Sequence, residues 1–307
     1  MFHGISISGI DELDICYKEN MSRGILIVIA SGAAHIIKKQ LIDMDISEED
    51  ITEFTFGNMQ INPTPYEFIV KRIHDINITY RLFCDEKSRR VFEGLLKYRI
   101  SRNTKYLADI TDDENEQYFD KEIIHLSDKE CFVDCGAFIG DTMCEYAKRT
   151  EGEWMAYYGF EADNNVFSQL SLNAEEFRNV ELYNIGCWDS HTRLSFDSIG
   201  SGSSRIVNIE TKDGIEVDSL DHILGNKKVT FIKMDIEGAE RKALMGAETI
   251  IKKEKPILAI STYHSLEDFI YLPQMMAQLN EEYKIYLRHY RFLSDSETVC
   301  YAIPKRK

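Results

Sequence analysis

The sequence predicts an α/β fold: a doubly wound, mostly parallel sheet of about seven strands, with a smaller α/β and helical region before it. Three observations lead to this prediction. From residue 129 onward, short apolar runs alternate with helix-forming segments. The last two apolar runs have no helical pattern between them, so we expect an antiparallel hairpin there. A glycine turn follows the first of these runs, as at the edge of a parallel sheet.

The first part of the chain is predicted to hold two smaller units. Residues 1–60 are expected to form a small Rossmann-like half-domain, because the buried-strand run Gly24–Ala30 precedes a helix over Ala33–Met44. Residues 61–112 are predicted to be a helical connecting region, and the acidic stretch near Asp112 marks its end. Its best helical segments are Tyr66–Ile73 and Lys87–Arg99.

The third region, residues 113–307, carries the alternating pattern. Helical segments over Asn165–Glu176 and Ala239–Lys252 are among those that separate strands expected to run parallel. An insertion, Arg193–Asp218, contains the run Gly200-Ser201-Gly202-Ser203-Ser204, which predicts a flexible loop near the site. The predicted strands are Cys131–Asp134, Met155–Glu161, Val180–Ile185, Val229–Asp235, Ile257–Ser261, Lys284–His289 and Thr298–Ile303.

Composition and charge argue against several classes of protein. The formal net charge of −16 disfavours binding to nucleic acid or to anionic membranes, both of which need an excess of Lys and Arg. No apolar run approaches the ~20 residues that cross a bilayer, so no integral membrane span is expected. Seven cysteines without a CxxC pair predict a reduced, cytoplasmic protein.

The most informative segment is Phe132–Thr142, FVDCGAFIGDT. An apolar run ends in Asp134, and the glycines that follow let the backbone approach a ligand, whose negative end can meet the free N–H groups of the next helix. Glu161 ends the next apolar run, where a carboxylate can accept hydrogen bonds from both hydroxyls of a ribose. This ordered pair predicts a cofactor that contains adenosine.

A second segment, Phe231–Glu240, reads FIKMDIEGAE. Together the two segments resemble the class I S-adenosylmethionine-dependent methyltransferases, and specifically the FkbM family, over roughly residues 117–304. The strand followed by Lys-x-Asp-x-Glu-Gly-x-Glu is the more distinctive part of this resemblance. The final antiparallel hairpin is also similar to class I enzymes and is lacking in ordinary dinucleotide dehydrogenases. The resemblance implies S-adenosyl-L-methionine as the cofactor.

The resemblance also implies which residues bind that cofactor. The strand end and turn would line its methionine part, a helix N-terminus would meet its carboxylate, the next acid would hold the ribose, and residues after the third strand would flank adenine. In that order these residues are Asp134, Gly136, Ala137, Phe138 and Gly140, then Asp141 and Thr142, then Glu161 with Ala162, and finally Cys187 and Trp188. A core or lid position is the alternative for Trp188.

Three residues are candidates to receive the proton of an acceptor hydroxyl. His264, which follows the fifth strand, is the first choice because its intrinsic pKa lies near neutrality. Asp235 ends the fourth strand and Glu237 follows it, although Asp235 could serve the turn or the cofactor amine and Glu237 could cap a helix. Tyr263, Ser203 and His289 are the candidates for binding the substrate. We expect no metal ion, although Asp235, Glu237 and His264 could surround Mg²⁺.

The leading functional prediction is an S-adenosylmethionine-dependent O-methyltransferase that acts on a hydroxyl of a sugar, a glycan-related compound or a secondary metabolite. The acceptor class is implied by the family alone. One alternative is a nicotinamide-dependent oxidoreductase, which Glu161 would serve equally well. Another is a non-catalytic cofactor-binding or scaffold protein. The expected partners are a small-molecule or saccharide acceptor and a second copy of the chain that binds through the N-terminal region.

Overall fold

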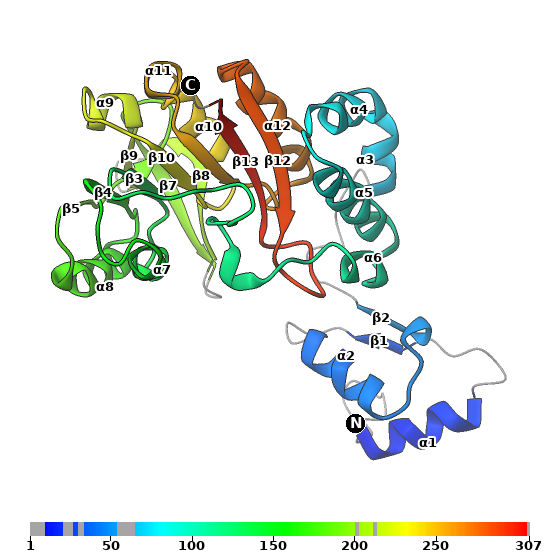
Figure 1. Ribbon diagram of the computed structural model, residues 1–307. Coiled ribbons are helices and arrows are strands. Elements are labelled where there is room, and N and C mark those ends of the chain that lie inside the picture. Colours follow the sequence, from blue (N-terminus) through cyan, green and yellow to red (C-terminus); the bar gives the residue numbers. More distant parts are fainter. Residues whose placement is uncertain are drawn as a thin grey trace.

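The computed structural model describes residues 10–20, 27–29, 34–53, 65–199, 203–210 and 214–305. Its centre is a seven-stranded sheet in the order β12-β13-β11-β10-β3-β4-β5 (Figure 1). β13 runs antiparallel to both of its neighbours, and the other four pairings are parallel, which confirms the predicted fold class. The strands are β3 (Cys131–Cys135), β4 (Ala156–Phe160), β5 (Val180–Tyr183), β10 (Phe231–Met234), β11 (Ile257–Ser261), β12 (Tyr283–His289) and β13 (Thr298–Pro304).

The central strands are buried on both faces. Every residue of β3, β10 and β11 is buried, which explains why these strands are continuous apolar runs rather than alternating ones. Successive residues belong to opposite cores: Phe132 packs with Phe231 on one face, whereas Val133 packs with Ile232 on the other. The two cores fix the register of the sheet and therefore the positions of the strand ends.

Helices cover the sheet and its β12 edge (Figure 1). The expected helix over Ala239–Lys252 is in fact two helices, and the break falls at Gly246. There the backbone passes so close to Trp188 that an added Cβ would lie 2.0 Å from its carbonyl oxygen. The helices of this part are α3 (Pro65–Lys71), α4 (Ile73–Leu82), α5 (Glu86–Ser101), α6 (Lys105–Ala108), α7 (Asp141–Arg149), α8 (Asn164–Asn173), α9 (Leu220–Leu224), α10 (Glu240–Met245), α11 (Glu248–Glu254) and α12 (Leu266–Leu279), with short 3-10 turns at Glu114–Glu116 and Ala174–Glu176.

The insertion before β10 contributes to a second sheet, which the sequence analysis did not predict. Strands β6 (Gly186–Cys187), β7 (Thr192–Ile199), β8 (Ser203–Glu210) and β9 (Ile215–Asp218) form it in the order β6-β9-β7-β8. Apolar and polar residues alternate along the middle of β7, which is the pattern of a strand. The flexible loop was predicted for residues 200–204 alone: residues 200–202 lie outside the described residues, and Ser203 and Ser204 begin β8.

The N-terminal unit has a strand–helix–strand order. It contains α1 (Ile10–Asn20), β1 (Ile27–Ile29), α2 (Ala34–Asp43), a 3-10 turn and β2 (Ile51–Glu53), and its two strands pair in parallel. It lies beside α6 in Figure 1, where Lys38 donates a 2.5 Å hydrogen bond to Thr104 and pairs with Glu48 at 2.8 Å. The domain boundaries near residues 60 and 112, and assembly through this unit, stay predictions. Among the described helices, none is long and apolar enough to cross a membrane.

Candidate active site

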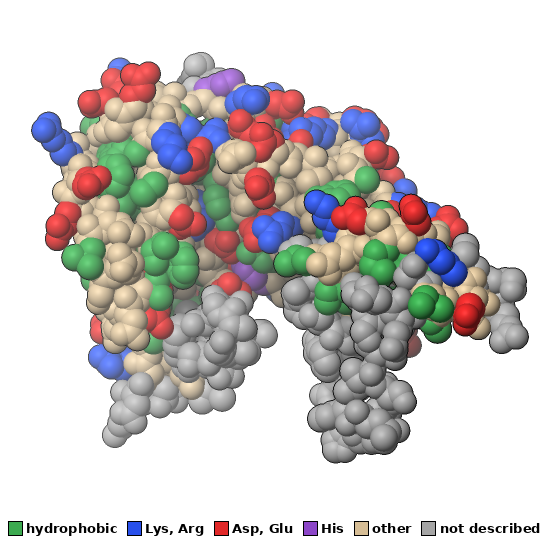
Figure 2. All heavy atoms as spheres, turned by 90° about the horizontal axis from the view of Figure 1, so that it is seen from below, with side chains coloured by type: hydrophobic (Ala, Val, Ile, Leu, Met, Phe, Trp, Pro, Cys, Tyr) green, Lys and Arg blue, Asp and Glu red, His purple; other side chains and the backbone are tan. Residues whose placement is uncertain are grey.

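A cavity of about 580 Å³ opens where the parallel strands end. Figure 2 looks onto this edge of the sheet from below and shows acidic side chains around a hollow in the middle of the face. Lys233 and Arg291 are the only Lys or Arg residues among the described residues that line the cavity. Seven carboxylates line it, from Glu114, Asp141, Glu161, Asp163, Asp235, Glu237 and Glu297. This excess of negative charge favours a ligand that carries positive charge.

The glycine turn after β3 forms one wall of the cavity. Gly136 has a φ of 77°, and an added Cβ would lie 2.0 Å from the backbone oxygen of Asp235. The N–H groups of Gly136 and Ala137 donate to the carbonyl of Phe160, at 3.0 and 2.9 Å. Phe138 also has a left-handed backbone, with a φ of 47°, and its half-exposed ring faces the cavity. The turn therefore joins β3, β4 and β10 in one rigid corner.

A buried ion pair lies beneath this turn. The carboxylate of Asp134 is fully buried, 2.9 Å from the ammonium of Lys233, and accepts a 2.6 Å hydrogen bond from the hydroxyl of Tyr157. Lys233 also donates to the carbonyl of Gly136 at 2.8 Å. Burial raises the pKa of Asp134, whereas the negative charges of Asp134 and Asp235 raise the pKa of Lys233 despite its burial. The structure thus places Asp134 under the turn rather than in the cavity lining.

Glu161 faces the cavity from the end of β4. One carboxylate oxygen accepts the N–H of Asp163 at 2.9 Å, and the other accepts the N–H of Phe138 at 3.1 Å. Burial raises the pKa of Glu161, although these N–H groups oppose the rise. A carboxylate offers about four acceptor positions, so Glu161 can still accept two ribose hydroxyls.

The expected cofactor-binding residues divide into two groups. Asp134 and Ala137 are buried beneath the turn, Gly140 precedes α7, and Trp188 packs with Leu194 and other core residues under the second sheet. None of these four belongs to the cavity lining. The expected residues that do line the cavity are Gly136, Phe138, Asp141, Thr142, Glu161, Ala162 and Cys187.

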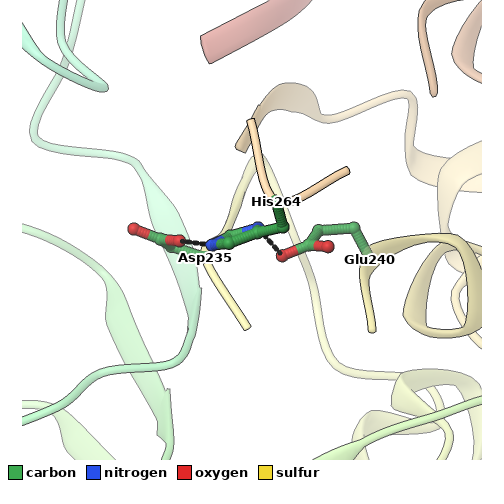
Figure 3. A group of neighbouring side chains, drawn as sticks. All are labelled: Asp235, Glu240 and His264. Carbon is green, nitrogen blue, oxygen red and sulfur yellow. Dashed lines mark ion pairs between the residues drawn. The ribbon is translucent and has the colours of Figure 1, made fainter. Parts of the chain in front are cut away.

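His264 lies between two carboxylates in Figure 3. Its Nε2 is 3.3 Å from Asp235, and its Nδ1 is 3.1 Å from Glu240. Burial alone would lower the pKa of His264, but the neighbouring carboxylates outweigh burial and raise this pKa to about 10. For Asp235 the effects are opposite in sign. Burial alone would raise its pKa, but His264 and Lys233 stabilise the carboxylate and bring the pKa of Asp235 below its usual value. His264 is therefore a cation at neutral pH in this arrangement.

Glu237 is the most accessible of the three proton-acceptor candidates. Its side chain is 40% exposed, lines the cavity and ends 3.7 Å from Nε2 of His264. Its φ of 55° places a non-glycine residue in the left-handed region, a strain that is common at functional sites. Glu237 does not cap a helix: α10 begins after Ala239 without a side-chain cap, and Glu240 accepts the nearby N–H of Ile236. Burial raises the pKa of Glu237.

Of the three substrate-binding candidates, the two whose side chains the structure describes do not line the cavity. The hydroxyl of Tyr263 donates to Asp235 at 3.2 Å. His289 is fully buried in the core, with Nδ1 2.9 Å from the hydroxyl oxygen of Thr298. Ser203 begins β8, and its side chain lies outside the described residues.

Two residues before β3 complete the site, and sequence reasoning missed both. The hydroxyl of Tyr118 donates a 2.6 Å hydrogen bond to Asp235, and the side-chain amide of Gln117 donates one of the same length to Glu297. Both residues line the cavity but belong to a polar segment without a recognisable pattern. Lys233, by contrast, could have been found, because it stands in the Lys-x-Asp-x-Glu-Gly-x-Glu segment.

Comparison with known protein families decides the relationship. The model of the family described as "Methyltransferase FkbM domain" matches residues 134–292, more than half of the chain. The chain belongs to the FkbM methyltransferase family. A search of curated proteins finds no significant match.

A solved structure shares the fold of this FkbM methyltransferase. Methyltransferase FkbM from Methylobacillus flagellatus KT is similar, with a TM-score of 0.76, 22% identity and coverage of 99% of this chain and 80% of that one. An rRNA methylase from Streptococcus thermophilus has a TM-score of 0.38 and 14% identity, over 68% of this chain and 96% of that one. Aeropyrum pernix fibrillarin, in complex with natively bound S-adenosyl-L-methionine, has a TM-score of 0.37 and 13% identity, over 60% of this chain and 71% of that one.

The cofactor of this FkbM methyltransferase is S-adenosyl-L-methionine, as expected from the sequence. The cavity fits that molecule. Its carboxylates suit a cofactor with a sulfonium and an ammonium group, and the N-terminus of α7 suits a carboxylate. Glu161 offers free acceptor positions to a ribose. Membership of this family does not favour the nicotinamide-dependent oxidoreductase considered above.

Proposed function

We propose that this methyltransferase transfers the methyl group of S-adenosyl-L-methionine to a hydroxyl oxygen of a sugar, a glycan-related compound or a secondary metabolite. The observation that carries this proposal is the accessible carboxylate of Glu237 at the cavity wall. A hydroxyl is a poor nucleophile until its proton is removed, and a carboxylate within hydrogen-bond reach can receive that proton.

The work of the protein in this reaction is mainly orientation. When bound, S-adenosyl-L-methionine supplies an electrophilic methyl group on a sulfonium. Glu161 and the turn at Gly136 would fix the cofactor side of the cavity, because both belong to the rigid corner between β3, β4 and β10. Glu237 would then face the acceptor hydroxyl, so that the attacking oxygen is held in line with the bond that breaks.

Geometry supports Glu237 over His264 as the proton acceptor. Both ring nitrogens of His264 already face carboxylates, and only 8% of its side chain is exposed. Glu237 reaches the cavity directly. This assignment replaces His264, the first choice from the sequence, and leaves Asp235 as a neighbour held by Tyr118 and His264.

The charge of the cavity supports a neutral or cationic acceptor. Seven carboxylates face two basic residues among the lining residues described, so a phosphorylated acceptor or a nucleic acid would be repelled. Neutral hydroxylated compounds meet no such penalty, and their hydroxyls can donate to the carboxylates.

The test is to identify the product. The protein would be incubated with S-adenosyl-L-methionine and a panel of sugars, glycan fragments and hydroxylated metabolites, with an RNA fragment as the contrasting acceptor. Mass spectrometry would detect an added methyl group, and NMR would show which atom carries it. We expect a methyl group on oxygen; a methylated nitrogen, carbon or RNA would contradict the proposal.

Glu237→Gln should lower kcat by roughly 10²–10⁴-fold on the acceptor so found, because it removes the proton acceptor. The affinity for S-adenosylhomocysteine should stay nearly unchanged, which separates this role from cofactor binding. Glu281→Gln, at an exposed position far along the chain, is the matched control. A kcat within about threefold of wild type would remove Glu237 from this role.

A further inference from the structure

Four side chains beside the cavity form a group that we call the His264 cluster: Asp235, Glu237, Glu240 and His264. Three carboxylates surround one imidazole, so the cluster carries net negative charge even when His264 is protonated. Glu240 is fully buried and His264 is 8% exposed. An uncompensated charge at such a position is costly.

The ring nitrogens of His264 have no well-aligned hydrogen bond with any described residue, although both are buried. One carboxylate oxygen of Glu240, Oε2, likewise has no partner among the described groups. The Nε2 nitrogen points towards Asp235, on the side of the ring away from Glu240 (Figure 3). Buried polar atoms without partners call for an explanation, such as an ion that the site is built to hold.

The distances fit a metal ion better than a set of hydrogen bonds. Two donor atoms that each lie 2.0–2.2 Å from one ion are roughly 3 Å apart, and Nε2 of His264 lies 3.3 Å from Asp235. Donor atoms of Asp235, Glu240 and His264 all lie within 4.8 Å of one another. Glu240 faces the opposite nitrogen at 3.1 Å, the position from which a carboxylate orients a metal-binding imidazole.

We propose that the His264 cluster binds a divalent metal ion that takes the place of the proton on Nε2 of His264 and releases it to solvent, with Nε2 and the carboxylate of Asp235 as ligands and Glu240 as the residue that accepts the remaining N–H and orients the ring. A set of one imidazole and one carboxylate favours a first-row transition metal, such as Mn²⁺ or Zn²⁺, over Ca²⁺. Asp235 is further held by the hydroxyls of Tyr118 and Tyr263, at 2.6 and 3.2 Å. This proposal replaces the expectation that the protein has no metal ion.

The position of the ion gives it a role that rests on the proposed O-methylation. Asp235 and Glu237 both line the cavity, so the remaining coordination positions would be open to an acceptor oxygen. A metal-bound hydroxyl loses its proton more readily, and Glu237, 3.7 Å from Nε2 of His264, is near enough to take it.

The test is direct binding of Mn²⁺ to the full-length protein after treatment with EDTA. The electron paramagnetic resonance signal of free Mn²⁺ falls as the ion binds, so a titration gives the stoichiometry and Kd without an acceptor. We expect one Mn²⁺ per chain in the wild type. His264→Gln and Asp235→Asn should weaken binding at least tenfold, and Glu240→Gln by roughly 10–100-fold.

The matched control is His191→Gln, which breaks an exposed histidine–carboxylate pair, with His191 Nε2 3.0 Å from Glu216, and should leave binding unchanged. A second measurement needs no variant: bound Mn²⁺ should broaden the ring resonances of His264 in the wild-type protein more strongly than those of any other histidine. Absence of stoichiometric binding, or equal binding by folded His264→Gln, would overturn the proposal. The cluster would then be a protonated histidine held between carboxylates, without a metal ion. Since no turnover is measured, failure here and failure of the O-methylation proposal are distinguishable.

Discussion

The ammonium group of Lys233 lies 2.9 Å from the carboxylate of Asp134, and neither side chain is more than 3% exposed. The pair connects the fourth strand of the alternating pattern to the first, since β10 and β3 are neighbours. Because Lys233 also donates to the carbonyl of Gly136, the same side chain holds the turn that faces the cofactor cavity. The ion pair is therefore a structural element of the site, and Lys233 is also one of the residues that line the cavity.

Lys233→Met should destabilise the protein strongly, because it leaves the carboxylate of Asp134 buried without a partner. We expect the free energy of unfolding to fall by about 3–5 kcal/mol, as measured by urea denaturation. The matched control is Lys252→Met, which removes an exposed helical ion pair with Glu248 and should cost less than about 1 kcal/mol. Similar losses in the two variants would contradict the structural role of Lys233.

Gly136→Ala should be far more damaging than Gly152→Ala. Both glycines have a φ of 77°, so the backbone penalty of about 1–2 kcal/mol is shared. Only at Gly136 would the new Cβ meet a backbone atom, 2.0 Å from the oxygen of Asp235; at Gly152 nothing lies within 4 Å. Thermal unfolding and the affinity for S-adenosylhomocysteine would compare the two variants. Equal Tm values would show that the turn can shift to admit a side chain.

Glu161→Gln should weaken the binding of S-adenosylhomocysteine by roughly 5- to 150-fold, or about 1–3 kcal/mol. Both carboxylate oxygens accept backbone N–H groups, from Phe138 and Asp163, and the amide of glutamine offers only one oxygen. One N–H would face the NH₂ group, and the charge that assists the ribose hydrogen bonds would be lost. Isothermal titration calorimetry would measure the affinity, with the exposed Glu153→Gln as control. Unchanged affinity would place the ribose elsewhere.

His289 should make the protein less stable in mild acid. Burial lowers the pKa of His289 from its ordinary value of 6.5 to about 4. Below pH 6.5 the unfolded chain binds a proton at His289, whereas the folded protein keeps His289 neutral. The free energy of unfolding therefore falls as the pH drops from about 6.5 towards 4. Between pH 7.5 and 5 this loss amounts to about 2 kcal/mol.

His289→Asn cannot titrate, so its stability should fall less steeply over that pH range, even if it is lower at neutral pH. Urea denaturation at several pH values would measure the two slopes. The exposed His74→Asn is the control and should follow the wild type. Parallel slopes for the wild type and His289→Asn would show that another group governs the acid sensitivity.

Local sequence patterns predicted the sheet well because its central strands are buried on both faces. Continuous apolar runs mark such strands, and the final hairpin followed from the missing helix between its two runs. The rule that parallel strands end at one edge also brought Asp235 and His264 together, from strands β10 and β11. The same rule misplaced His289 at the end of β12, because it does not predict which face of a strand a side chain occupies.

Contacts between distant segments could not be predicted in this way. Tyr118 donates a hydrogen bond to Asp235, 117 residues further along the chain. The polar sequence around Tyr118 has no pattern that predicts this contact. The pKa of His264 depends on Glu240, which lies on a separate helix. Only the folded structure shows that Glu240 faces the imidazole ring. The sheet at residues 186–218 was missed because composition was weighed above alternation.

The walls of the cavity come partly from outside the segment that defines the family. Residues 134–292 supply the turn, Glu161 and the His264 cluster, but Gln117, Tyr118 and Glu297 lie beyond that segment at either end. Gln117 also donates a hydrogen bond to Glu297, so the two flanking segments are joined at the cavity wall. A substitution in either flank would therefore alter the wall of the cavity without touching the segment that defines the family.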